Sequence, residues 1–316
     1  METITLTIDG QKVSAPKGAT VLEVCRMNNI PIPTLCHDPA ITPSGACRLC
    51  VVQIEGMRNL PPSCATQAVE GMKVETQSSR VRSARKTILN LLVANHPLDC
   101  MTCQKLGNCS LAEYAYEYGV DGKIYKGEKR RLPIDDTNPY ILRDLNKCIL
   151  CGKCIATCEE VAERNVIGFA NRGFETKVST FMDTDLKDSS CVYCNRCVAI
   201  CPVGALVDKS MLGKGREWEF KKEDVTCTFC DYGCSFTINS KKGQVVGVTA
   251  KSAAKGRPLC LKGRMGADFR YNPDRKDLPF INQDGEFVQV TWSEFLGLGG
   301  IVDKISSLES KPAGID

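Results

Sequence analysis

The sequence predicts an α+β fold class, built as a modular chain of small domains and not around one large core. Three observations lead to this prediction. Short stretches with strand alternation and short stretches with helical periodicity follow one another along the 316 residues. Nineteen of the 20 cysteines and one of the two histidines fall into close, regular spacings. One of these spacings occurs twice, which indicates an internal duplication.

Composition and charge exclude several classes of function. Hydrophobic residues make up 43% and charged residues 25%, which is typical of a soluble globular protein. The net charge is only +4, so neither nucleic-acid binding nor membrane-surface binding is expected. The first residues alternate like a strand and no uncharged apolar run reaches about 18 residues, so no signal peptide or transmembrane helix is expected. We therefore expect a cytoplasmic protein, in which cysteines are metal ligands more often than disulfides.

The first predicted domain, residues 1–78, is small and rich in strands. Strand alternation over residues 4–16 surrounds a turn at Asp9-Gly10, which is a good hairpin signal. A short amphipathic helix follows, with Thr20 at or near its N-cap and Cys25 buried as a small hydrophobe. The helix is expected at residues 20–29 and two later strands at 50–55 and 72–76. This order of elements favours a β-grasp fold.

Four further domains are predicted after residue 78. Residues 79–138 are expected to be helical, with helices at 79–94 and 111–118. Residues 139–216 carry two dense cysteine runs, and residues 217–275 form a small unit with strands at 235–239 and 245–249. Residues 276–316 hold a strand candidate at 287–291 and a helix candidate at 292–307.

The potential metal ligands form five groups. In chain order they are Cys36, Cys47, Cys50 and Cys64; His96, Cys100, Cys103 and Cys109; Cys148, Cys151, Cys154 and Cys158; Cys191, Cys194, Cys197 and Cys201; and Cys227, Cys230, Cys234 and Cys260. Thiolates are the ligands that iron–sulfur clusters use, because soft sulfur suits iron. Zinc is the alternative for each group, since closely spaced cysteines also bind zinc.

The duplicated group is the most specific of these patterns. Both copies have the spacing C-x2-C-x2-C-x3-C, and Pro202 follows the second copy. This is the bacterial two-cluster ferredoxin run, in which the fourth cysteine of each run binds the other cluster. We therefore expect one 4Fe–4S cluster on Cys148, Cys151, Cys154 and Cys201, and a second on Cys158, Cys191, Cys194 and Cys197.

The first two groups are similar to sites in the large subunits of respiratory NADH dehydrogenase, NAD-linked formate dehydrogenase and iron-only hydrogenase. The stretch from Gly45 to Cys50, GACRLC, resembles the loop around their 2Fe–2S cluster, which implies that Cys36, Cys47, Cys50 and Cys64 hold such a cluster. His37 is then not a ligand and is expected to be solvated or capping. The stretch NHPLDC resembles their unusual 4Fe–4S site, which implies the ligands His96, Cys100, Cys103 and Cys109.

The last group, with the continuation LCLKGR, resembles the 4Fe–4S site of molybdenum- or tungsten-pterin oxidoreductases. The resemblance implies a 4Fe–4S cluster on Cys227, Cys230, Cys234 and Cys260. In that family a lysine two residues after the last cysteine lies between cluster and pterin. Lys262 stands at this position and would bind there only beside a pterin; otherwise it is expected to be a surface lysine.

Taken in order, the groups resemble the N-terminal iron–sulfur half of these large subunits without a complete catalytic domain, which implies that residues 276–316 are a remnant or the start of a molybdopterin-oxidoreductase-like domain. The resemblance implies four kinds of domain: β-grasp 2Fe–2S, helical histidine-ligated 4Fe–4S, two-cluster ferredoxin-like, and small β-rich 4Fe–4S. It also implies one 2Fe–2S and four 4Fe–4S clusters in an electron-transfer subunit of an NAD(P)H-linked complex, such as an electron-bifurcating, ferredoxin-dependent one. No nucleotide-binding glycine motif follows a strand, so flavin and NAD are not expected on this chain alone. The resemblance implies that most of a pterin pocket would be missing, so pterin is not expected on this chain alone either.

The resemblance implies two partners, a flavin-containing NADH-binding subunit and a small 2Fe–2S subunit, with soluble ferredoxin or a further catalytic subunit as the next redox partner. No substrate-turnover site is visible in the sequence. The main alternative is the N-terminal part of a molybdenum- or tungsten-dependent formate dehydrogenase catalytic subunit. A zinc-stapled scaffold and the arm of a membrane-bound NADH dehydrogenase are the remaining alternatives.

Overall fold

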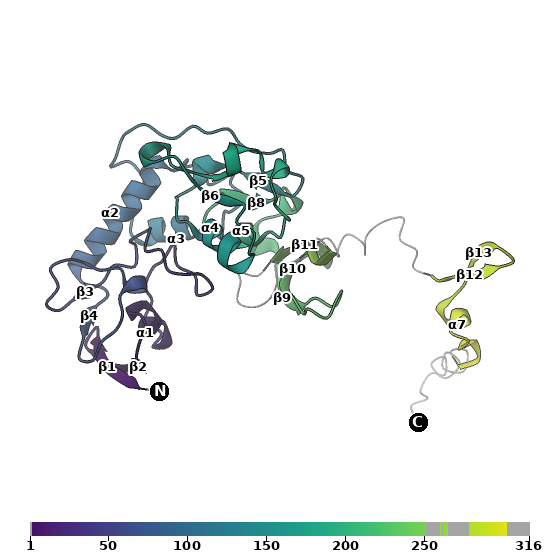
Figure 1. Ribbon diagram of the computed structural model, residues 1–316, viewed down its shortest axis with the longest axis horizontal. Helices are drawn as coiled ribbons and strands as arrows, with labels where there is room; N and C mark the ends of the chain where they lie inside the picture. Colours follow the sequence, from purple (N-terminus) through teal and green to yellow (C-terminus); the bar gives the residue numbers. More distant parts are fainter. Residues whose placement is uncertain (1, 251–259, 261, 265–277, 302–316) are drawn as a thin grey trace, which may run out of the picture. The chain divides into compact units, whose positions relative to one another are not determined.

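Small helices and strands are mixed along the whole structure, a computed structural model that describes residues 2–250, 260, 262–264 and 278–301. The chain divides into two units, Met1–Met265 and Gly266–Asp316. Figure 1 labels most helices and strands of both units, numbered in chain order. An α+β chain of small domains is thus confirmed at this level.

A four-stranded sheet opens the first unit. Its strands are β1 (Thr3–Ile8), β2 (Gln11–Pro16), β3 (Gln53–Ile54) and β4 (Lys73–Glu75), in the order β2-β1-β4-β3. Strands β1 and β2 form the predicted hairpin, and β1 also runs parallel to β4. Asp9 and Gly10 both have positive φ (49° and 82°), the backbone that a tight two-residue hairpin turn requires.

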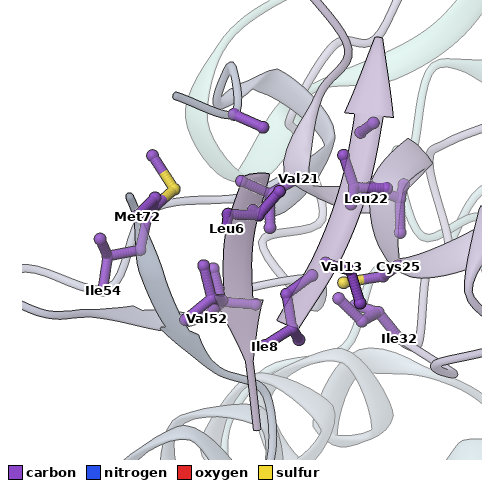
Figure 2. Packing of buried hydrophobic residues seen from close by; sticks show 14 of the residues in the cluster. Leu6, Ile8, Val13, Val21, Leu22, Cys25, Ile32, Val52, Ile54 and Met72 are labelled. Carbon is purple, nitrogen blue, oxygen red and sulfur yellow. The ribbon is translucent and has the colours of Figure 1, made fainter. Parts of the chain in front are cut away.

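Helix α1 (Val21–Met27) packs on this sheet as the sequence predicts. Thr20 and Glu23 form a reciprocal capping box at its start, so the expected N-cap is confirmed. The helix contributes four fully buried residues to the domain core, including Cys25. Figure 2 shows Cys25 beside Val13 and Ile32, where its thiol packs as a small hydrophobe.

Helices α2 (Ser79–Asn95) and α3 (Ser110–Glu117) follow, close to their predicted bounds. Arg85 in α2 is fully buried and connects segments that are far apart in the sequence. Its guanidinium donates to the Val51 carbonyl (2.9 Å) and to the Tyr118 hydroxyl (3.2 Å). Arg85 therefore ties the N-terminal domain to the helical segment.

The region of the two cysteine runs contains short strands that the sequence pattern does not predict. They pair as β5 (Ile141–Arg143) with β8 (Leu206–Asp208), and as β6 (Ile167–Ala170) with β7 (Lys177–Thr180). The first cysteine run contains the short helix α4 (Lys153–Ala156), and the second run contains the short helix α5 (Arg196–Ile200). A π-helical turn, η3 (Thr157–Val161), continues α4 and carries Cys158.

Three antiparallel strands follow in the first unit, before the described residues 260 and 262–264. They are β9 (Lys221–Thr226), β10 (Ser235–Lys241) and β11 (Gln244–Ala250), in the order β11-β10-β9. The sequence predicts the last two. Strand β9 has the sequence KKEDVT, whose charges hide its strand character and suit an exposed edge.

The second unit contains β12 (Phe280–Gln283), β13 (Glu286–Gln289) and α7 (Trp292–Phe295). The predicted continuous helix over residues 292–307 is wrong, because α7 ends at Phe295 and helical backbone resumes only at residues 299–301. Gly297 takes a positive φ of 66° and the Leu298 N–H donates to the Ser293 carbonyl (2.7 Å), which is a Schellman stop. Residues 302–307 lie outside the described residues. Every helix in the described ranges is too short or too polar to cross a membrane.

Candidate metal centres

The first group of cysteines, the N-terminal site, consists of two thiol pairs. Cys47 donates to Cys36 and Cys64 donates to Cys50, and these hydrogen bonds lower the pKa of Cys36 to about 5 and of Cys50 to about 6. The same bonds raise the pKa of the two donors. Electrostatic interactions between the pairs place all four sulfurs in one neighbourhood. The structure therefore brings this predicted set together.

The loop around Cys47 has a backbone conformation that turns its thiol toward Cys36. Gly45 and Arg48 have positive φ (61° and 56°), which turns the chain sharply around Cys47. The Cys47 N–H donates to Cys36 Sγ (3.4 Å). Backbone amides directed at ligand sulfurs are one determinant of cluster potential.

His37, expected to be solvated or capping, is buried, so the prediction that it is solvated is wrong. Its exposed fraction is 8%, and burial lowers the pKa of the imidazole. The reason is tertiary: distant residues cover the loop that follows Cys36. Glu160 accepts from the Thr42 N–H (2.7 Å), and Lys153 pairs with Asp38 (3.7 Å).

The second group, the histidine site, lies between α2 and α3. His96 is the C-cap residue of α2, and Cys109 is the N-cap residue of α3. The imidazole is 9% exposed and its buried Nδ1 has no hydrogen-bond partner, while burial lowers its pKa and favours the neutral form. Burial, together with the nearby charges of Cys103 and Cys100, raises the pKa of Cys109. The thiols of Cys100, Cys103 and Cys109 are thus neighbours, and the Nδ1 atom of the buried His96 imidazole is free of hydrogen bonds.

The two ferredoxin-like runs line two separate small cavities. Cys148, Cys151 and Cys154 share one cavity with Cys201, and we call this the first dicluster site. The second dicluster site is the other cavity, lined by Cys158, Cys191, Cys194 and Cys197. Apolar side chains complete both walls, among them Leu145 and Val203 in the first and Ile141 and Val166 in the second. Each cavity therefore combines three cysteines of one run with the last cysteine of the other.

The internal repeat extends to the backbone. Leu150 and Tyr193, each two residues after the first cysteine of a run, have φ of 54° and 53°. Their N–H groups donate to Cys148 Sγ and Cys191 Sγ, at 3.4 Å in both cases. Gly152 and Asn195 follow the second cysteines and also have positive φ. The two loops thus curl around their sulfurs in the same way.

The first dicluster site lies directly against the histidine site. A Cβ atom placed on Gly204 would lie 2.6 Å from Cys103 Sγ, closer than any side chain tolerates. The Ser110 N–H, at the start of α3, donates to the Pro202 carbonyl (3.0 Å). Glycine at position 204 therefore permits the contact between the two sites.

The last group, the C-terminal site, is more open. Cys227 is buried, Cys234 is half-buried, and Cys230 and Cys260 are exposed. Burial raises the pKa of Cys234, and the charges of the other three cysteines of the group raise it further, so the four thiols are neighbours. Lys262 is exposed, as expected of a surface lysine.

The donor chemistry at these sites fits iron–sulfur clusters. Soft thiolates are concentrated in each group, apolar walls surround the dicluster sites, and the buried Nδ1 of His96 lacks a partner. Within the described residues, no three His, Cys, Asp or Glu side chains stand at the geometry of a single metal ion.

Three arginines near these sites were not identified from the sequence. Arg130 donates to the carbonyls of Cys148 and Thr176, at 3.1 Å each. Arg196 is buried within electrostatic range of Cys194 and Cys234. Arg264 donates to the Tyr193 carbonyl (2.7 Å). Two of them have a signal in the sequence, since Arg196 lies inside a cysteine run and Arg264 lies four residues after Cys260.

Four family models match successive parts of the chain. They describe a 2Fe-2S iron-sulfur cluster binding domain (residues 1–79), an NADH-ubiquinone oxidoreductase-G iron-sulfur binding region (85–123), a 4Fe-4S dicluster domain (147–205) and a molybdopterin oxidoreductase Fe4S4 domain (220–272). The chain therefore contains 2Fe–2S and 4Fe–4S binding domains.

Curated relatives match nearly the whole chain. An NADH-quinone oxidoreductase subunit of Rhizobium meliloti is 37% identical over 295 residues, which cover 92% of this chain and 34% of the relative. The alpha subunit of an NADPH-Fe(3+) oxidoreductase of Geobacter sulfurreducens is 37% identical over 279 residues, which cover 88% and 33%. The chain thus spans about a third of the length of these relatives.

A solved structure matches over most of its own length. It is a chain in the crystal structure of an NAD+-reducing [NiFe]-hydrogenase in the H2-reduced state, with 33% identity and a TM-score of 0.61. The match covers 65% of this chain and 87% of that chain. The chain therefore belongs to the family of iron–sulfur subunits that includes the NADH-quinone oxidoreductase relative and this hydrogenase chain, and corresponds to the iron–sulfur part of such subunits.

Proposed function

We propose that this chain is an iron–sulfur electron-transfer subunit of a multi-subunit NAD(P)H-linked oxidoreductase complex. It passes single electrons between a flavin-containing NADH-binding subunit and another redox partner. The main support is the pair of cavities, each lined by three cysteines of one run and the last cysteine of the other. Two relatives carry NADH or NADPH in their names, and a third is part of an NAD+-reducing hydrogenase.

The proposed cofactors are one 2Fe–2S and four 4Fe–4S clusters, each of which would supply a site for one electron. The 2Fe–2S cluster belongs to the N-terminal site, within a domain of the β-grasp type. The 4Fe–4S clusters belong to the histidine site, to the two dicluster sites and to the C-terminal site. The proposed ligands are the four residues of each group, with Cys158 and Cys201 exchanged between the two cysteine runs.

The protein's own part is to hold, shield and adjust these sites. Thiolates supply the ligand atoms, and the N–H groups of Leu150 and Tyr193 donate to ligand sulfurs. Apolar walls keep water from the dicluster sites, where burial raises the pKa of Cys154 and Cys197 strongly. Deprotonation of these two cysteines is therefore coupled to cluster binding.

The proposed partners are the flavin-containing NADH-binding subunit and a small 2Fe–2S subunit, with ferredoxin or a further catalytic subunit beyond them. Electron bifurcation would require such a ferredoxin partner. A second candidate is part of a molybdenum- or tungsten-dependent formate dehydrogenase. The match of residues 220–272 to a molybdopterin oxidoreductase Fe4S4 domain supports this candidate.

Metal and sulfide analysis of the anaerobically purified protein, with its associated subunits, tests these proposals. We expect about 18 iron atoms per chain, from one two-iron and four four-iron clusters, with matching acid-labile sulfide. Associated flavin and NAD(P)H-dependent reduction of the clusters are expected in the complex. Zinc in place of iron would refute the electron-transfer proposal, and stoichiometric molybdenum or tungsten would favour the second candidate.

His96→Cys should lower the reduction potential of the cluster at the histidine site. A thiolate adds a negative charge where the neutral imidazole has none, so the reduced cluster is destabilised. In Rieske centres two histidine ligands raise the potential by at least about 250 mV over plant-type ferredoxins, so a decrease of roughly 100 mV is expected here for one ligand. Potentiometric titration followed by EPR spectroscopy measures it. His37→Gln, at the other buried histidine, should leave this potential unchanged, and an unaltered potential in His96→Cys would refute ligation by His96.

A further inference from the structure

Arg264 links the C-terminal site to the second dicluster site. Its backbone N–H donates to the Cys260 carbonyl (3.0 Å), so its main chain belongs to the segment that carries the last C-terminal cysteine. Its side chain is only 1% exposed. The guanidinium donates to the Tyr193 carbonyl (2.7 Å), between Cys191 and Cys194, and lies 5.6 Å from the Tyr140 ring centroid.

A buried carboxylate accompanies this guanidinium. Asp208, at the end of β8, is paired with Arg264 at 2.9 Å, and its side chain is 9% exposed. The carboxylate also accepts from the side chain of Asn195, which directly follows Cys194. Both charged side chains therefore contact the loop that supplies Cys191 and Cys194, Arg264 at Tyr193 and Asp208 at Asn195. Burial raises the pKa of both thiols, and the charge of Arg264 is among the effects that lower it.

We propose that Arg264 and Asp208 are positioning residues of the second dicluster site, and that this ion pair sets the reduction potential of its 4Fe–4S cluster. The proposal rests on the proposed function, because it presumes that the cluster is bound. Arg264 holds the loop through the Tyr193 carbonyl, and Asp208 holds it through Asn195. The segment that carries Cys260 and Arg264 thereby affects the potential of the second dicluster cluster, to which it contributes no ligand.

The two charges act in opposite directions. Reduction adds one negative charge to the cluster, so a nearby guanidinium stabilises the reduced form and a nearby carboxylate destabilises it. The pair is shielded from water, so neither effect is strongly screened. Removing one partner also leaves the other charge buried and uncompensated. Opposite potential shifts are therefore the signature of this ion pair.

The test is EPR-monitored potentiometry on the full chain with its clusters bound. The signal of the second dicluster site is identified as the one that Cys191→Ser abolishes. Arg264→Gln should lower its midpoint potential by about 59 mV, a tenfold shift in the reduced-to-oxidised ratio of a one-electron couple. Asp208→Asn should raise the potential, the double variant should return it toward the wild-type value, and Arg264→Lys should shift it least.

A buried ion pair elsewhere provides the matched control. Lys153 and Asp38 are also largely shielded from water (3.7 Å; 13% and 13% exposed), and neither lines the second dicluster site, so Asp38→Asn tests the effect of disturbing such a pair. It should leave the second dicluster potential unchanged. Shifts of equal sign in Arg264→Gln and Asp208→Asn, or no shift in either, would overturn the proposal. If the Arg264→Gln variant loses the cluster, the potentials of the Asp208→Asn and Arg264→Lys variants test the proposal instead. Absence of clusters from the wild-type chain would instead contradict the proposed function.

Discussion

Cys158→Ser is expected to abolish the cluster of the other cysteine run, not that of its own. Cys158 lies in the run that begins at Cys148, yet it lines the cavity of Cys191, Cys194 and Cys197. A serine hydroxyl is a much poorer ligand than a thiolate, so one 4Fe–4S cluster should be lost or strongly destabilised. Cys158→Ser should therefore remove the same EPR signal as Cys191→Ser, together with the iron of one cluster.

The reciprocal variant is the matched control. Cys201→Ser should remove the same signal as Cys148→Ser, because Cys201 lines the cavity of the first run. If each serine variant instead removed the signal of its own run, the interleaved ligand assignment would be incorrect. The two cavities would then have to be described with a different set of ligands.

Gly204→Ala is expected to disrupt the contact between the histidine site and the first dicluster site. Its new Cβ would lie 2.6 Å from Cys103 Sγ, and a sulfur bound to a cluster could not move aside freely. Overpacking of this kind costs about 1–3 kcal/mol in buried positions. We expect a lower temperature of thermal unfolding and partial loss of the EPR signal from the histidine site.

Gly168→Ala is the matched control for this steric argument. Gly168 lies in β6, and a Cβ atom placed there would meet nothing within 4 Å. This variant should keep both the cluster content and the unfolding temperature. Equal effects of the two substitutions would show that the contact at Gly204 has no special importance.

The local elements could be predicted well wherever the pattern was strong. The hairpin around Asp9, the capped helix α1 and helix α2 follow from alternation, capping residues and helical periodicity. Strand β9 was missed because its charged residues do not alternate. The helix predicted from Trp292 onward was too long, because the stop at Gly297 depends on a backbone conformation that periodicity does not reveal.

The sequence by itself determined the five groups of closely spaced potential ligands and the kind of metal chemistry that they predict, because ligand spacing within a loop is a local property and thiolates suit iron. Only the tertiary structure decided which other residues, distant in the sequence, lie beside these ligand groups. It buried His37, placed Gly204 against Cys103 and brought Arg264 to the Tyr193 carbonyl. The physical reason is that such contacts join segments separated by dozens of residues, and their geometry depends on how the small domains pack together.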